Sequence, residues 1–358
     1  MKKIIAVLIF SLSLKVFSQR VENVIIITLD GMRWQEVFSG ADSILVNDSN
    51  FVHNRKGLKE MFWAASADER RKKLFPFFWN TIANQGQLHG NRWLGNKINN
   101  ANRYWFSYPG YNEIFTGYPD DSVNSNDKIP NKNINVLEFL NKQPALNGKV
   151  AAFTSWDTFD AIFNEPRAKF LVSSGFDTLK IKDPAFDLLN EMQFNSPQPL
   201  GDGVRPDFMT YSIAKEYVKK MKPRVLYMGF DETDDYAHEG KYDQYLYAAH
   251  LIDQWIADLW SYIQSQPQYK NKTALIITTD HGRGDKIKKE WTSHGAKIAD
   301  ASEIWMAVLG PGIQSLGEVN TKAQLYQKQV ATTIASLLGY NFTPEHPVTE
   351  PVKSVIGK

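Results

Sequence analysis

The chain has 358 residues, of which 43% are hydrophobic and 13% aromatic, so it can bury a large core and is neither disordered nor fibrous. Its 41 basic and 39 acidic residues give a formal charge of +2 without a long run of either sign, and we therefore expect small ligands rather than nucleic acid. The chain contains no cysteine, which excludes disulfides, thiolate metal sites and a cysteine nucleophile.

The first residues have the pattern of a secretory signal peptide. Two lysines precede an apolar run over residues 4–14, and Ser18 supplies a small residue after a short polar break. The run is shorter than the ~18 residues of a typical membrane span. We therefore predict that residues 1–18 are removed and that residues 19–358 form a periplasmic or secreted domain without a stable membrane anchor. The oligomeric state does not follow from the sequence.

Short apolar runs of strand length recur along the chain, with helical patterns between them. The runs do not alternate apolar and polar residues, which indicates strands buried on both faces of a parallel sheet. Alternation of strands and helices predicts an α/β fold with helices on both faces. The predicted strands are residues 24–29, 149–153, 224–230, 274–279 and 304–310, and the predicted helices are residues 135–143, 208–222, 242–264 and 323–338.

Two polar, aromatic-rich stretches fit this plan less well. Residues 40–104 and 155–207 are longer than ordinary connections, although residues 68–85 are predicted to hold one helix interrupted at Pro76. Long connections in a compact α/β domain commonly form active-site walls or lids. We therefore predict that both stretches are walls or cap insertions beside an active site.

Acidic residues follow three of the predicted strands. Asp30 follows the first run, Asp234 comes shortly after the run that ends at Phe230, and Asp280 follows the run that ends at Thr279. Because ligands of an open parallel sheet bind at the carboxyl ends of its strands, these side chains are expected to gather at one edge. A single aspartate there more often caps a helix or forms a turn, so the inference depends on the whole set.

Three of the seven histidines accompany these aspartates. His238 comes four residues after Asp234, which puts both side chains on one side of a helical turn. His281 directly follows Asp280, and His294 lies a short loop later. Carboxylates and imidazoles are the ligands that zinc-like ions take from proteins, so the set allows two sites of about three or four ligands each. The other histidines are assigned to the core or surface: His53, His89, His250 and His346.

A serine lies among aromatic rings in RYWFSYPGYNEIFTG, residues 103–117. Read alone, Ser107 is the N-cap of a short helix, with Pro109 near the first turn and Gly117 closing it. The alternative is that its hydroxyl takes part in chemistry, and the stretch itself does not decide between the two.

The motifs together resemble the alkaline phosphatase superfamily and, within it, the branch of nucleotide pyrophosphatases and type I phosphodiesterases. They are LDG at Asp30, S-x-P followed by TG from Ser107, D-x-x-x-H from Asp234, DHG from Asp280 and a final HG at His294. The resemblance covers most of the mature chain. It implies a three-layer αβα sandwich with a mostly parallel central sheet and with loop or cap insertions near the active site.

The resemblance also implies roles for individual residues. Ser107 would be the nucleophile and would form a phosphoseryl intermediate. The resemblance implies two zinc ions, with Asp30, Ser107, Asp280 and His281 as ligands of one and Asp234, His238 and His294 as ligands of the other. Divalent ions other than zinc can also occupy carboxylate-rich sites.

The stretch around Ser107 departs from the pattern of this branch in two places. Serine replaces the usual threonine, and Gly110 replaces the asparagine that follows the proline. The asparagine that contacts the phosphoryl oxygen in such enzymes corresponds to Asn126 or Asn124 in DDSVNSND. Further candidates for substrate contact are Arg33, Arg167 and Lys169 as cations and Tyr108 as part of an aromatic wall.

These residues predict a metal-dependent hydrolase of a small phosphate ester, and the resemblance favours phosphodiester or nucleotide-like substrates. A phosphomonoesterase of the same fold is the main alternative. A sulfatase is disfavoured because Tyr111 stands where that branch has arginine, and because three histidines favour zinc over calcium. A phosphoglycerate mutase-like enzyme, which is cytosolic, disagrees with the signal peptide. A non-catalytic binding protein would have no reason to keep the whole ligand set.

Overall fold

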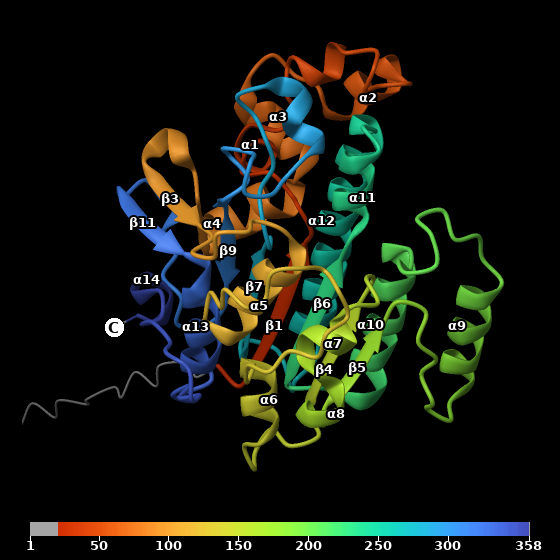
Figure 1. Cartoon of the computed structure of the whole chain (residues 1–358), viewed down its shortest axis with the longest axis vertical. Helices are drawn as coiled ribbons and strands as arrows, with labels where there is room; N and C mark the ends of the chain where they lie inside the picture. Colours follow the sequence, from red (N-terminus) through yellow and green to blue (C-terminus); the bar gives the residue numbers. More distant parts are fainter. Residues whose placement is uncertain (1–20, 358) are drawn as a thin grey trace, which may run out of the picture.

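The computed structural model describes residues 21–357, so the signal peptide predicted for residues 1–18 lies outside the described residues. A central sheet runs through the molecule (Figure 1). It comprises β1 (Asn23–Leu29), β2 (Gln87–His89), β4 (Val150–Thr154), β5 (Leu171–Ser174), β6 (Val225–Phe230), β7 (Thr273–Thr278), β9 (Met306–Leu309) and β10 (Gly317–Glu318). A smaller sheet comprises β3 (Asn96–Asn99), β8 (Glu303–Ile304) and β11 (Ala323–Tyr326).

The strand order of the central sheet is β10-β2-β9-β7-β1-β6-β4-β5. The five strands from β7 to β5 are parallel to their neighbours, and β10 is parallel to β2. The predicted α/β fold with a mostly parallel sheet is therefore confirmed.

The helices of the chain pack mainly around this sheet. Within residues 21–357, none of them combines the length and the apolar character needed to cross a bilayer. They are α1 (Trp34–Ser39), α2 (Arg55–Phe62), α3 (Ala67–Leu74), α4 (Ala83–Gln85), α5 (Ser107–Thr116), α6 (Val136–Asn141), α7 (Phe159–Phe163), α8 (Glu165–Ala168), α9 (Pro184–Phe194), α10 (Asp207–Met221), α11 (Glu232–His238), α12 (Tyr242–Ser265), α13 (Val330–Leu337) and α14 (Lys353–Ile356).

Each face of the sheet has its own hydrophobic core. Along β1, the side chains of Ile25 and Ile27 belong to a core shared with α10 and α12. Those of Val24 and Ile26 belong to a second core shared with α5, α6 and α13. Because successive side chains of a strand point to opposite faces, both sets must be apolar when helices cover both faces. This explains the unbroken apolar runs and gives the three layers.

Two predicted elements differ in the structure. The predicted strand 304–310 is confirmed in part as β9, but it runs antiparallel to β7 and β2. Burial on both faces makes a strand apolar in either direction, so the pattern did not reveal this. The predicted helix 323–338 begins too early, because residues 323–326 form β11, which pairs in parallel with β3. Its helical part is α13.

Residues 40–104 and 155–207, the two long polar stretches, contain regular secondary structure as well as loops. Within residues 40–104, β2 joins the central sheet and β3 joins the smaller one. The predicted break at Pro76 is confirmed, since α3 ends at Leu74 and a π-helix, η2 (Phe78–Ile82), follows. Asp253 of α12 accepts hydrogen bonds from the backbone N–H groups of residues 77 and 78, at 2.8 and 3.1 Å, which caps the restarted helix. Within residues 155–207, α9 projects from the side of the molecule (Figure 1).

Candidate metal centre

The predicted ligands meet at the carboxyl ends of three neighbouring strands, β7, β1 and β6. The sequence places them there because each stands at or shortly after the point where a buried strand ends. Asp30 follows β1, Asp234 and His238 lie on α11 directly after β6, Asp280 and His281 follow β7, and His294 follows the short helix η4 (Lys288–Thr292).

One cluster consists of Asp234, His238 and His294, and His294 Nε2 lies 3.9 Å from Asp234 Oδ1. The Nε2 atoms of the two imidazoles are 2.9 Å apart, and His238 Nε2 is 3.1 Å from Asp234 Oδ2. Nitrogen and oxygen ligands bind zinc at about 2.0–2.2 Å, so ligands of one ion lie at most about 4.4 Å apart. The cluster therefore has the size of one metal site.

A second cluster surrounds His281. Its Nε2 atom is 3.4 Å from Asp30 Oδ1 and 3.4 Å from Asp280 Oδ2. Among the described residues, none of these three buried atoms has a hydrogen-bond partner, which is costly for polar groups. His281 Nδ1 donates to the carbonyl of Gly282 at 3.0 Å, so the lone pair of Nε2 faces the two carboxylates. A divalent cation between the three atoms would satisfy all of them.

Burial shifts the pKa values of ligands in both clusters. Burial, reinforced by the neighbouring carboxylates, raises the pKa of Asp30 well above its usual range, and burial raises the pKa of Asp280 to about 8. Burial also lowers the pKa of His281 well below its usual range and that of His294 to about 4. Neutral imidazoles are the form that binds metal. A cation would offset the repulsion between the carboxylates.

The metal-free protein is expected to lose stability between pH 7 and pH 9. The pKa of folded Asp280, about 8, lies above the ordinary value of 3.8. The folded state therefore holds a proton that the unfolded state has released, and the free energy of unfolding falls as pH rises through the folded pKa, by about 1 kcal/mol. His281 and His294 contribute little in this range, because burial lowers the pKa of each in the folded state and an unfolded histidine is mostly neutral above about pH 7.

Thermal unfolding in excess chelator at pH 7 and pH 9 measures this effect. We expect the melting temperature to fall by about 2 °C, because a chain of this length has a large entropy of unfolding. Asp280→Asn should reduce the dependence without abolishing it, because burial also raises the pKa of Asp253, to about 7. A melting temperature of the chelated protein that does not change across this range would contradict the assignment.

Ser107 is the first residue of α5 and not its N-cap, so the capping interpretation of the isolated stretch is wrong. Phe106 has the extended backbone of an N-cap, with φ −145° and ψ 176°. No side-chain hydrogen bond caps the helix from this position. The hydroxyl of Ser107 is therefore not required for the start of the helix.

The face of α5 that carries Ser107 packs on the candidate ligands. Gly110 and Tyr111 lie three and four residues later, on the same face. A Cβ atom at Gly110 would lie 2.5 Å from the backbone oxygen of Asp280, so no side chain fits where the phosphodiesterase branch has asparagine. The hydroxyl of Tyr111 donates to Asp30 Oδ2 at 2.8 Å, which leaves Oδ1 for a metal.

The structure distinguishes the two candidate asparagines. Asn126 Oδ1 accepts a hydrogen bond from the backbone N–H of Tyr108 at 3.0 Å. Its side-chain amide therefore lies at the start of α5, one residue from Ser107. Asn124 instead lines a neighbouring cavity. Of the two, Asn126 is the one placed to reach a group bound at Ser107.

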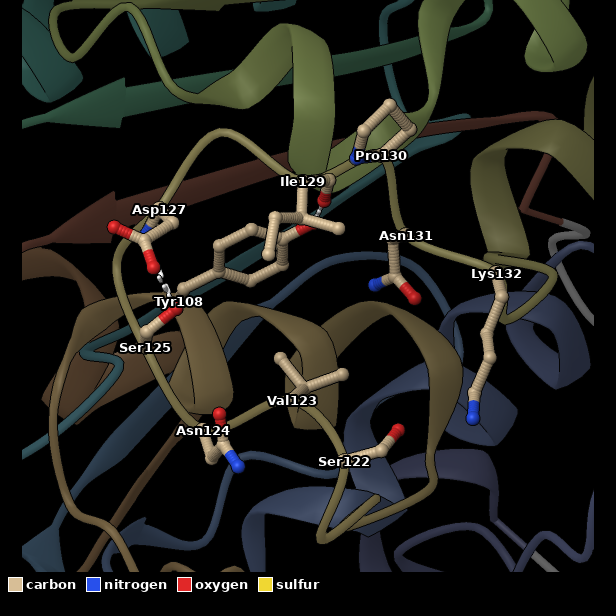
Figure 2. Close-up of a pocket in the computed structure, with 10 residues that line it drawn as sticks. All are labelled: Tyr108, Ser122, Val123, Asn124, Ser125, Asp127, Ile129, Pro130, Asn131 and Lys132. Atoms are coloured by element: carbon tan, nitrogen blue, oxygen red, sulfur yellow. Dashed lines mark hydrogen bonds between the residues drawn. The ribbon is translucent and has the colours of Figure 1, made fainter.

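This cavity, of about 250 Å³, lies beside the start of α5 (Figure 2). The loop 122–132 forms most of its wall, and the ring of Tyr108 forms another part. Val123, Ile129 and Pro130 contribute apolar surface to it. The Tyr108 hydroxyl donates to the carbonyl of Ile129 at 2.5 Å, which fixes the ring in place. Within the described residues, the wall includes none of the candidate metal ligands.

Arg33 is not available to a substrate, and its assignment as a substrate-binding residue is wrong. Its buried guanidinium donates to the Glu36 carboxylate at 2.9 and 2.6 Å and to the carbonyl of Gly284 at 2.9 Å. A buried charge must be paired, and Glu36 supplies the partner. Arg167 is likewise engaged, by Glu138 at 3.0 Å and by backbone carbonyls of the loop 131–133.

Arg283 was not predicted as a site residue, although it lies in the same DHGRGD motif as Asp280 and His281. Its side chain is fully buried and donates to the Asp234 carboxylate. Burial by itself would raise the pKa of Asp234, but Arg283, followed by His238, holds that pKa well below its usual range. A basic residue two positions after a predicted ligand pair was the available signal.

Comparison with known proteins agrees with this geometry. Residues 180–341, which hold five of the six carboxylate and imidazole ligands, match the family model described as Metalloenzyme superfamily. A search of curated proteins found no match. The family match implies a divalent metal, and the two clusters are its candidate sites.

Solved structures of low sequence identity share the fold. Wild-type alkaline phosphatase PafA is 11% identical, with a TM-score of 0.63 over 94% of this chain and 99% of that chain. The lipoteichoic acid synthase LtaP from Listeria monocytogenes is 13% identical, with a TM-score of 0.57 over 92% and 74%. A putative sulfatase from Bacteroides thetaiotaomicron is 12% identical, with a TM-score of 0.57 over 94% and 75%.

The chain therefore has an α/β fold that matches alkaline phosphatase-like structures, and it carries two clusters of candidate metal ligands. The resemblance of the motifs to the alkaline phosphatase superfamily is therefore confirmed for the superfamily as a whole. The narrower branch of nucleotide pyrophosphatases and phosphodiesterases stays a prediction, because the structural neighbours include a phosphatase, a synthase and a putative sulfatase.

Proposed function

We propose that this protein is an exported, metal-dependent hydrolase of small phosphate esters that uses Ser107 as its nucleophile and prefers phosphodiester or nucleotide-like substrates. The observation that carries the proposal is that the predicted carboxylate and imidazole ligands meet at one edge of the sheet, where the serine-bearing face of α5 packs on Asp280 and Asp30. A nucleophile, two metal clusters and a helix N-terminus thus converge.

The donor set fits zinc. It combines imidazoles with carboxylates in two clusters, one of Asp234, His238 and His294 and one of Asp30, Asp280 and His281. When bound, such ions stabilise a serine alkoxide and the negative charge that develops on the phosphoryl and leaving oxygens. The proposed ligands are Asp30, Asp280, His281 and Ser107 for one ion, and Asp234, His238 and His294 for the other.

The chain's own groups would then act in sequence. Ser107 Oγ loses its proton and forms a bond to phosphorus while the bond to the ester oxygen on the opposite side breaks, and the departing alcohol takes up a proton. Water then cleaves the phosphoseryl ester. The start of α5 favours a bound anion. Because Asn126 Oδ1 is held by the Tyr108 N–H, its Nδ2 group is the donor left for a phosphoryl oxygen.

Two observations support a diester over a monoester. A monoester carries one more negative charge, so a monoesterase typically places a cation near the phosphoryl oxygens. Arg33 and Arg167, two of the predicted candidates, are paired with Glu36 and Glu138 instead. A second ester group needs an apolar recess, and the cavity lined by Tyr108, the residue that follows Ser107 in the chain, offers one (Figure 2).

Rates on bis(4-nitrophenyl) phosphate, 4-nitrophenyl phosphate and 4-nitrophenyl sulfate test the proposal. We expect kcat/KM to be highest for the diester, by about tenfold or more, which corresponds to about 1.4 kcal/mol. Faster turnover of the monoester would favour the phosphomonoesterase alternative. Faster turnover of the sulfate would favour a sulfatase, whereas a metal-loaded protein inactive on all three would contradict the hydrolase proposal.

A further inference from the structure

The carboxylate of Asp234 lies between the two candidate sites. It belongs to the cluster with His238 and His294 and also to a group formed with Asp30 and His281. Its Oδ2 atom is 3.1 Å from His238 Nε2, whereas its Oδ1 atom is 3.7 Å from His281 Nε2. A carboxylate in this position can bind one ion or bridge two. A neighbouring group must therefore determine whether Asp234 binds one ion or bridges two.

Arg283 contacts Oδ1 of Asp234, the oxygen that lies between the imidazoles of His281, at 3.7 Å, and His294, at 3.9 Å. Its Nη2 group donates to Oδ1 of Asp234 and, at 3.1 Å, to the backbone carbonyl of the same residue. The guanidinium is fully buried. A charge-assisted contact of this kind orients a carboxylate strongly, because both partners are removed from water.

Gly31 provides the space for this contact. A Cβ atom at this position would lie 2.6 Å from Asp234 Oδ1 and 2.8 Å from Arg283 Nε. Gly31 also has a φ of +57°, a conformation that side chains disfavour. The DHGR motif therefore supplies the guanidinium of Arg283, and the glycine of the LDG motif leaves room for it beside the Asp234 carboxylate.

We propose that Arg283 is a positioning residue that commits Asp234 to a single ion. By holding Oδ1, it leaves Oδ2, which is 3.1 Å from His238 Nε2, as the oxygen that would bind the ion shared with His238 and His294, and it keeps Oδ1 from binding the ion at Asp30, Asp280 and His281. This inference rests on the two-ion centre of the proposed function. A competing explanation is that the guanidinium only replaces an ion in the metal-free protein. The two explanations predict opposite changes in metal affinity.

Zinc titration of the metal-free protein by calorimetry, with wild type, Arg283→Gln and Arg283→Lys, tests the inference. In Arg283→Gln we expect the zinc affinity of the site formed by Asp234, His238 and His294 to fall by about 10–100-fold, which is the usual effect of losing a residue that orients a ligand. The site formed by Asp30, Asp280 and His281 should keep its affinity. Arg283→Lys should lose less zinc affinity, because lysine keeps the positive charge but lacks the several N–H donors of the planar guanidinium. Cobalt absorption spectra report whether the ligand geometry at the weakened site has changed.

The matched control is Arg205→Gln, which removes another fully buried guanidinium, bonded to the backbone carbonyls of Thr154 and Ser173. It should leave both zinc affinities unchanged. Unchanged or tighter zinc binding by Arg283→Gln would overturn the inference. If that variant does not fold, wild-type affinities in Arg283→Lys would overturn it instead. Wild-type protein that binds no zinc or other divalent ion would refute the metal centre itself, which is a separate failure.

Discussion

Replacing Ser107 with alanine is expected to lower kcat on a bis-aryl phosphate by about 10⁴-fold or more, because removing a nucleophile removes the covalent route altogether. Binding of substrate should change much less, since the helix N-terminus and Asn126 are untouched. The measurement is steady-state kinetics with zinc-saturated protein, together with zinc content, which should stay near two ions if three residues hold each site.

Two further variants make this result interpretable. Ser107→Thr keeps the hydroxyl and should retain most of the activity. Ser212→Ala removes another helical serine, whose hydroxyl donates to the Phe208 carbonyl on the exposed side of α10, and should behave like wild type. If Ser107→Ala keeps more than about a tenth of the wild-type rate, the covalent mechanism is wrong.

Replacing His294 with alanine is expected to reduce the zinc content from two ions to one and to lower kcat by about 10³-fold. The cluster of His294, His238 and Asp234 would keep two ligands, too few for a stable zinc site. The lost ion would otherwise contribute several kcal/mol of charge stabilisation in the transition state. Elemental analysis after gel filtration and kinetics on the same samples give both values.

His53→Ala is the matched control, because His53 is exposed and lies outside both clusters. It should keep two ions and full activity. Retention of two tightly bound ions by His294→Ala would show that this histidine is not a ligand, and the site of Asp234 and His238 would then need a different third residue.

Much of the candidate centre could be predicted from the sequence because its residues follow buried strands. Asp30 and Asp280 stand next to apolar runs that have no other interpretation than buried strands, and parallel strands bring their carboxyl ends to one edge. The spacing of Asp234 and His238 is local, so a helical turn suffices to bring them together. Local pattern and fold class therefore predict where these groups lie.

The substrate-binding residues were less predictable because their roles depend on long-range partners. Arg33 follows the LDG motif and looks free in the sequence, yet Glu36 and Gly284 engage it. Tyr111 served only as an argument against a sulfatase, while the structure adds its hydrogen bond to Asp30. A charge or hydroxyl has the same appearance in the sequence whether its partner is solvent, substrate or another side chain.

The sequence by itself determined the α/β class, the apolar strands covered on both faces and the positions of the candidate metal ligands, because strand burial and helical spacing are local patterns. Only the tertiary structure decided the direction of β9, the strand pairing of β11 and the contact of Arg283 with Asp234. Each of these depends on a partner distant in sequence, and the contact with that partner forms only when the chain has folded.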